Sequence, residues 1–161
     1  MEAAAFERAL RPLLRQSGAY AASILHDRRA AEDAVQQAAL KAWERRSQFD
    51  TGRSFSAWWF GILHNQSLDV LRQAKRMPAG TILDEVAATV PADESVLDCR
   101  ALGAAMETLP EGQSEVVKLR YFADLSYAEI ARVLDIPAGT VMSRLHLARH
   151  ALAAIMRSEE P

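Results

Sequence analysis

Groups that could bind a polyanion are concentrated near the carboxyl end of the chain, between residues 125 and 149. The side chains concerned are Thr140, Ser143, Arg144, His146 and Arg149. Hydroxyl, imidazole and guanidinium groups donate hydrogen bonds to phosphate oxygens and to the edges of bases. The stretch from Gly139 to Arg157 holds three arginines and no acidic residue, so its charge also suits a polyanion. The pattern therefore favours recognition of DNA.

Two short helices joined by a tight turn would hold these groups in place. Ser126 and Glu129 have the spacing of a capping box, so the first helix should begin here. Asp135 tolerates the left-handed backbone of a turn, and Pro137 suits the first turn of a following helix. That second helix would bury Val141, Leu145, Ala148 and Leu152. The pattern predicts a helix-turn-helix, although paired amphipathic helices are also common in all-α proteins that bind no DNA.

The N-terminal half is predicted to be helical as well. A first amphipathic helix is interrupted by Pro12, and a second is expected from about Ala19 to Leu25. A third helix should extend from its cap at Asp27 to about Gln48. After a turn-rich loop at residues 49–53, Ser54 should cap a further long helix.

The helix that follows Ser54 carries two adjacent tryptophans, Trp58 and Trp59, which allow two interpretations. Exposed aromatic rings can stack on single-stranded bases, each stack contributing about 1–3 kcal/mol. At helical spacing with Phe55 and Leu63, however, aromatic side chains are more often part of a hydrophobic core. The sequence favours the core and leaves the stacking platform as the alternative.

The formal net charge of −2 conceals a strong division along the chain. Residues 41–76 contain seven basic and three acidic residues, a net charge of +4, whereas residues 77–99 contain five acidic and no basic residues, a net charge of −5. Attraction of phosphate depends on the local potential within about 8–10 Å. The basic block can therefore bind nucleic acid although the total charge is negative.

The acidic stretch also has the composition of a connector, with two prolines, one glycine and no helical apolar stripe. We therefore predict an all-α protein with two small helical domains, at residues 1–76 and 99–161, joined by a flexible acidic linker at residues 77–98. A solvated connector is the simpler interpretation of this linker. The alternative is a segment that lies along a basic protein channel or mimics nucleic acid.

Other features argue against an enzyme, a metalloprotein or a membrane protein. The sequence has no nucleophile elbow, phosphate-binding glycine loop or histidine–cysteine zinc cluster, so no catalytic residue, cofactor or metal is expected. His146 and His150 could form a metal pair, but without a neighbouring Cys, Asp or Glu they are better explained as solvated or DNA-facing. The single cysteine, Cys99, is better explained as a small buried thiol than as a redox sensor. With no secretory signal and no membrane-spanning run, a cytoplasmic location is expected.

Four sequence blocks resemble one known family, the bacterial sigma factors of the extracytoplasmic-function (ECF) class. In the C-terminal half these are TLPEGQSEVVKLRYFADLSYAEIA (residues 108–131) and IPAGTVMSRLHLAR (residues 136–149). In the N-terminal half they are AEDAVQQAALKAW (residues 31–43) and FSAWWFGILHNQSLDVLR (residues 55–72). Blocks from both halves, in the family's order, make the resemblance more specific than a helix-turn-helix alone.

The resemblance implies a role for each predicted domain and for particular residues. The N-terminal domain would bind the β′ clamp helices of core RNA polymerase through Asp33, Gln36, Gln37 and Leu40. It would capture the opened −10 promoter element through Phe49, Asp50, Gly52, Arg53, Ser54, Asn65, Asp69, Arg72, Lys75 and Arg76. The C-terminal domain would contact the β flap and bind the −35 element through Thr140, Ser143, Arg144, His146 and Arg149. The expected partners are core RNA polymerase, promoter DNA and an anti-sigma factor.

Several positions depart from the family pattern. Met142 and Leu147 stand where many relatives have Lys or Arg on the second helix of the helix-turn-helix, and Gly61 and His64 also replace commoner basic residues. Each lost phosphate contact flattens the logarithmic salt dependence of DNA binding by nearly one unit of slope. The −35 element would therefore be bound more weakly here or read differently.

These departures leave two alternatives to a transcription initiation factor. One is a sigma-like decoy that occupies an anti-sigma factor, although such decoys usually carry a receiver domain and no βα repeat is present. The other is an ordinary helix-turn-helix regulator, which would leave the N-terminal sequence blocks unexplained.

Overall fold

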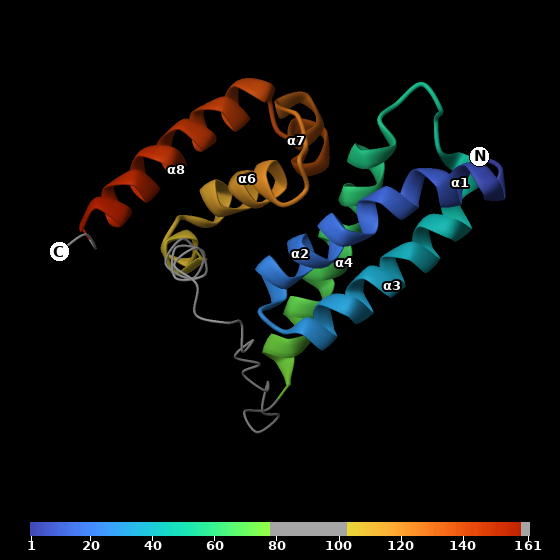
Figure 1. The fold of residues 1–161 in the computed structure, drawn as a ribbon, viewed down its shortest axis with the longest axis horizontal. Helices are drawn as coiled ribbons and strands as arrows, with labels where there is room; N and C mark the ends of the chain where they lie inside the picture. Colours follow the sequence, from blue (N-terminus) through green and yellow to red (C-terminus); the bar gives the residue numbers. More distant parts are fainter. Residues whose placement is uncertain (78–102, 159–161) are drawn as a thin grey trace.

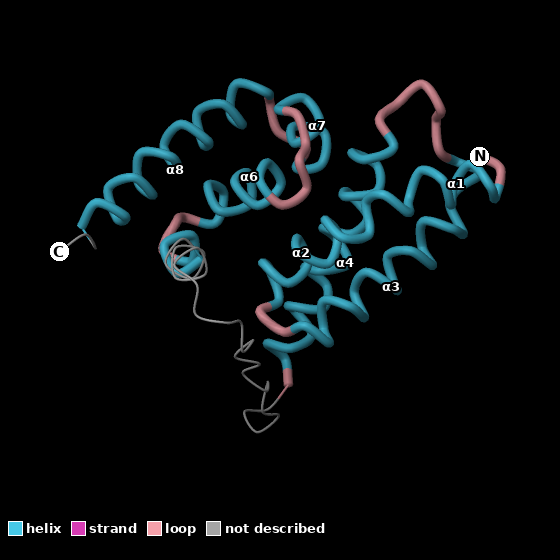
Figure 2. The backbone as a smooth tube through the Cα atoms, in the orientation of Figure 1, coloured by secondary structure: helices cyan, strands magenta, loops and turns pink. Residues whose placement is uncertain are grey.

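The computed structural model describes residues 1–77 and 103–158, and every regular element in these ranges is a helix (Figures 1 and 2). The predicted all-α class is thereby confirmed. The predicted linker at 77–98, together with Cys99, falls outside the described residues except for Met77, so the prediction of flexibility there stays a prediction.

The N-terminal module consists of four α-helices. They are α1 (Ala3–Leu10), α2 (Leu14–Leu25), α3 (Arg28–Arg45) and α4 (Phe55–Arg76). A short 3-10 turn, Arg11–Leu13, contains Pro12 and separates α1 from α2, so the predicted interruption is confirmed. The second helix begins five residues earlier than the sequence indicated, at Leu14. The caps at Asp27 and Ser54 are both present, since their side chains accept hydrogen bonds from the backbone N–H of Ala30 at 2.9 Å and of Ala57 at 3.2 Å.

Small side chains on α3 allow the N-terminal helices to pack closely. Its buried residues are Ala31, Ala34, Ala38 and Ala42, a stripe that lies against α2 and α4. Between the helices, Trp59, Phe60 and Leu63 from α4 are completely buried together with Tyr20 from α2. The indole Nε1 of Trp59 donates a hydrogen bond to the Ser17 hydroxyl at 2.8 Å, which satisfies the only polar atom of a fully buried tryptophan.

The C-terminal module contains a short helical segment at residues 103–107 and three longer helices. These are α6 (Glu111–Tyr121), α7 (Tyr127–Leu134) and α8 (Ala138–Ser158). The capping box at Ser126 and Glu129 is formed as predicted, and Asp135 adopts the left-handed conformation with φ 53°. The predicted helix-turn-helix is therefore confirmed as α7 and α8, with Pro137 directly before α8.

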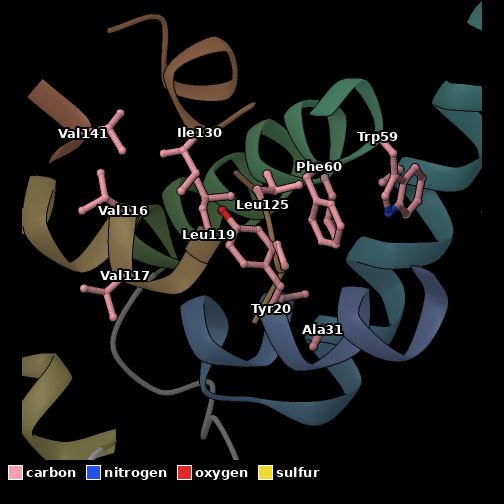
Figure 3. Close-up of a cluster of buried hydrophobic side chains, with 14 of the residues drawn as sticks. Tyr20, Ala31, Trp59, Phe60, Val116, Val117, Leu119, Leu125, Ile130 and Val141 are labelled. Atoms are coloured by element: carbon pink, nitrogen blue, oxygen red, sulfur yellow. The ribbon is translucent and has the colours of Figure 1, made fainter. Parts of the chain in front are cut away.

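The two modules pack against each other. Helix α7 packs against α4, and α6 contacts α2 (Figure 1). Buried side chains of both modules belong to one hydrophobic cluster, in which Leu119 and Leu125 of the C-terminal module lie beside Tyr20 and Phe60 (Figure 3). This docking brings residues that are about 75 positions apart in the sequence into direct contact.

Candidate nucleic-acid interface

The polar face of α3 is exposed on the side of the helix opposite its alanine stripe. Asp33, Gln36 and Gln37 are exposed, and Leu40 is 57% exposed although it is a large apolar residue. All four residues predicted to bind the polymerase therefore lie on one accessible face. The aromatic ring of Trp43 continues this face by one turn, and the guanidinium of Arg46 lies 3.8 Å from its centroid. Trp43 is itself 40% exposed.

The loop before α4 is anchored by an aromatic side chain. Phe49 is only 8% exposed and packs against Phe55 and Trp58, with ring centroids 5.5 and 5.0 Å apart. The Phe49 ring thus anchors the loop to the core of the module. It could contact a base only if it left its packing against Phe55 and Trp58. Asp50, Gly52 and Arg53 form the exposed part of the loop.

Within that loop, Asp50 organises the backbone and neutralises a charge. Its carboxylate accepts a hydrogen bond from the Gly52 N–H at 2.9 Å and forms an ion pair with the Arg53 Nε at 3.2 Å. Both side chains of the ion pair are more than 60% exposed, so the pair is weak and a phosphate could displace the carboxylate.

The two tryptophans have different environments, which settles the choice between core and platform. Trp59 is completely buried in the N-terminal module. Trp58 is half-buried and lines a cleft between α4 and α7. The core interpretation is right for Trp59, whereas Trp58 keeps part of its ring accessible.

The cleft between α4 and α7 has a volume of about 320 Å³. On one wall lie three residues of the predicted −10 set, Arg53, Ser54 and Asn65, and on the other lie Arg132 and Val133 of α7. A nucleic-acid strand bound along α4 would therefore meet α7 in the docked arrangement.

A hydrogen bond closes one end of this cleft. The Ser54 hydroxyl, which also caps α4, donates to the carboxylate of Glu129. Partial burial by itself would raise the pKa of Glu129, but the hydrogen bonds from Ser54 and from Ser126 outweigh it and hold the pKa below its ordinary value. One carboxylate thus completes the capping box of α7 and joins the two modules.

Replacing Glu129 with alanine should therefore remove both interactions at once. We expect the free energy of unfolding to fall by about 1 kcal/mol, the size of a helix cap. Glu129→Gln is the matched control, because its amide oxygen can still accept from Ser54 or the Ser126 backbone. Thermal unfolding of the three proteins measures the difference, and equal midpoints for alanine and glutamine would contradict the assigned contacts.

The lowered pKa also predicts a pH dependence. Because Glu129 binds its proton less tightly in the folded state, its charge contributes stability above the unfolded pKa of about 4.3. That contribution is lost as the pH falls through the lower folded pKa. The stability difference between wild type and Glu129→Gln should shrink as the pH falls below about 4.3; a constant difference would contradict this prediction.

The end of α4 carries the remaining predicted DNA contacts. Asn65 is exposed, and the carboxylate of Asp69 is paired with the Arg72 guanidinium at 3.3 Å. Lys75 and Arg76 are exposed in the last turn. Arg72, Lys75 and Arg76 therefore give the C-terminal end of α4 an exposed basic surface.

A buried polar chain that the sequence analysis did not anticipate lies between the modules. The Tyr20 hydroxyl is 2.8 Å from Nδ1 of His64, and Nε2 of His64 is 3.7 Å from the Glu115 carboxylate. Burial and the charge of Arg72 lower the pKa of His64, while burial and the neighbouring Glu115 raise the pKa of Tyr20. At neutral pH the tyrosine therefore donates to a neutral imidazole, whose Nε2–H faces Glu115. The sequence alone shows His64 only as a departure from the family's basic residue. Its two partners cannot be recognised there, because Tyr20 and Glu115 lie 44 and 51 positions away.

The polar residues of α8 lie in two regions, one facing the other helices of the module and one facing outward. Arg144 is half-buried, and its guanidinium lies so close to α6 that a Cβ at Gly112 would be 3.0 Å from it. Arg149 donates to the hydroxyls of Tyr121 at 3.1 Å and Tyr127 at 3.4 Å. Both predicted DNA-binding arginines are thus directed toward other helices of the module.

The outward face of α8 carries the other predicted contacts. Ser143 and His146 are exposed, the Ser143 hydroxyl donating back to the Gly139 carbonyl at 3.0 Å, while Thr140 is half-buried. The rings of His146 and His150 stack edge to face, 4.4 Å between centroids. Among the described residues no group of three or more potential ligands could hold a metal ion. None of the described helices combines the length and apolar character needed to cross a membrane.

Comparisons with known proteins agree with this arrangement. Residues 8–77 match the family described as Sigma-70 region 2, and residues 99–152 match Sigma-70, region 4. The ECF RNA polymerase sigma factor SigW of Bacillus subtilis is 32% identical over 143 residues, covering 79% of this chain and 75% of SigW. The ECF RNA polymerase sigma factor SigL of Mycobacterium tuberculosis is 33% identical over 145 residues, covering 83% of this chain and 78% of SigL.

A solved structure extends the likeness to the whole fold. The sigma factor RpoE from Bartonella quintana, in complex with the anti-sigma factor NepR, superposes with a TM-score of 0.80 at 28% identity. The superposition covers 97% of this chain and 99% of that one, so it includes both modules. Together with the matched regions and relatives, it shows that this chain belongs to the ECF family of RNA polymerase sigma factors.

Proposed function

We propose that this sigma factor directs core RNA polymerase to specific promoters and helps to hold the opened strand, without catalysing a reaction itself. The N-terminal module would bind the β′ clamp helices through the exposed face of α3 and the −10 element through the loop before α4 and α4 itself. The C-terminal module would bind the β flap and place α8 on the −35 element. It would act in the cytoplasm, where RNA polymerase works.

One observation carries this division of roles. The exposed polar face of α3, with Asp33, Gln36 and Gln37, and the outward face of α8 lie on different modules, and α8 contains three arginines and no acidic residue. A protein-binding face and a polyanion-binding helix are thus available on one chain.

The docked arrangement supports a second element of the proposal. Because α7 faces the α4 wall that holds Arg53, Ser54 and Asn65 across the cleft, a strand lying along α4 would contact α7, and we propose that the two modules separate to admit it. We propose that core polymerase binds the separated form. The related RpoE is held by the anti-sigma factor NepR, and we propose that a protein of this kind binds the docked form of this chain.

Run-off transcription with core polymerase over a promoter library tests the proposal. An initiation factor yields transcripts that require both core enzyme and this protein. A sigma-like decoy or an operator-binding regulator yields none, and that result would overturn the proposal. DNA binding without polymerase would then distinguish the regulator from the decoy.

A further inference from the structure

The outward face of α8 is unusual in its chemistry. Met142 and Leu147 are 56% and 55% exposed, large apolar side chains on a helix whose opposite face is fully buried through Val141, Leu145 and Ala148. Each side chain leaves more than half of its surface in water, and both lie on a helix face proposed to bind a partner, so contact with that partner would bury apolar surface.

Helical geometry places these two residues around a compact patch. Met142 and His146 are one turn apart, and so are Ser143 and Leu147. The four side chains therefore form two adjacent rows on the first half of α8, each with one apolar and one polar member. We call these four residues the α8 patch.

The positive charge of the helix lies beside this patch and not on it. Arg144 rests against Gly112 of α6, and Arg149 is bound to the hydroxyls of Tyr121 and Tyr127. The patch itself contains no cation of fixed charge. It is therefore poorly suited to guanine, which side chains read mainly through bidentate Arg or Lys contacts.

The major groove offers one apolar feature, the C5-methyl group of thymine. We propose that Met142 and Leu147 read thymine methyl groups in the duplex that α8 contacts, while Ser143 and His146 make the polar contacts between them. This inference rests on the proposed function, since it specifies what the promoter-binding helix reads. DNA is favoured over an apolar protein surface because α8 has three arginines and no acidic residue.

Exchange of thymine for deoxyuracil tests the inference, because it removes the methyl group and leaves every hydrogen-bonding atom in place. Duplexes that the full-length chain enriches from a random library would be resynthesised with deoxyuracil at each thymine in turn. Burial of one methyl corresponds to about fourfold in affinity. We expect a loss of this size at one or more positions, both in direct binding and in core-dependent transcription.

Variants connect the effect to the two side chains. Met142→Ala and Leu147→Ala should each abolish the sensitivity to deoxyuracil at one position while leaving core polymerase binding unchanged. Met156→Ala is the matched control, since Met156 is a half-buried residue further along α8, outside the patch. Met142→Lys should shift the preference toward guanine and steepen the logarithmic salt dependence by nearly one unit.

Each outcome decides between the alternatives. Equal binding of thymine and deoxyuracil duplexes at every position would overturn the inference, as would a sensitivity that persists in both alanine variants. If the alanine variants lost core polymerase binding, the patch would be a protein-docking surface and the inference would be wrong. If methyl sensitivity appears in direct binding but no core-dependent transcript forms, this inference stands and the proposed function fails.

Discussion

Replacing Asp33 and Gln36 together with alanine should weaken binding to core RNA polymerase by about 30-fold or more. Both side chains are exposed on α3, so the change should leave the fold intact. Hot-spot residues, which cluster near the centre of an interface, contribute about 2 kcal/mol or more, and 1.4 kcal/mol corresponds to a factor of ten. Co-migration with core enzyme and the concentration dependence of run-off transcription measure the loss.

Two controls make this result specific. Arg15→Ala changes an exposed residue on α2, away from the α3 face, and should retain core binding. The double variant should also bind duplex DNA through α8 as the wild type does. If core binding survived, or if DNA binding were lost in parallel, the assignment of α3 to the polymerase would be wrong.

Replacing Trp59 with alanine should have the largest effect on stability. Trp59 is completely buried, and its indole donates to Ser17. Truncation of a buried tryptophan costs about 3–5 kcal/mol, which is a large part of the stability of a small domain. All three tryptophans lie in the N-terminal module, so denaturant unfolding followed by their fluorescence reports on this module and, through Trp58, on its cleft with α7.

The neighbouring tryptophan provides the comparison. Trp58→Ala removes a half-buried ring at the cleft and should cost much less stability than Trp59→Ala. It should instead reduce formation of the open promoter complex if the cleft binds the opened strand. Equal destabilisation by the two variants would contradict the different environments found for these adjacent residues.

The docking of the two modules depends on interactions of unequal strength. The contact between the His26 imidazole and the Glu107 carboxylate is 3.3 Å long, but both side chains are about half exposed, so it contributes little. The continuous apolar cluster, the Ser54–Glu129 hydrogen bond and the buried chain through His64 are better shielded from water. In the proposed separated form these groups would be exposed to solvent, and binding of polymerase and DNA would have to compensate for that cost.

Local sequence patterns determined the helices and their ends. The caps at Asp27 and Ser54, the capping box at Ser126 and Glu129, and the left-handed turn at Asp135 each depend on side chains within a few residues of the backbone groups that they satisfy. Short-range hydrogen bonding can be read from the sequence because the interacting groups are neighbours in it. The apolar repeat likewise predicted the buried line of α8, which is fully buried at Val141, Leu145 and Ala148 and half-buried at Leu152.

Tertiary structure alone decided how the candidate DNA contacts are presented. Phe49 was expected at a DNA strand but lies under the loop, and Arg149 is held by hydroxyls 22 and 28 positions away. The division between Trp58 and Trp59 and the position of Asn65 across the cleft from α7 depend on how the helices pack. Helical periodicity indicates which side of a helix is apolar, but it does not indicate which other helix packs against that side. The sequence therefore determined the helices, their family and their candidate residues, whereas the packing of the helices, within each module and between the two, decided how those residues are presented.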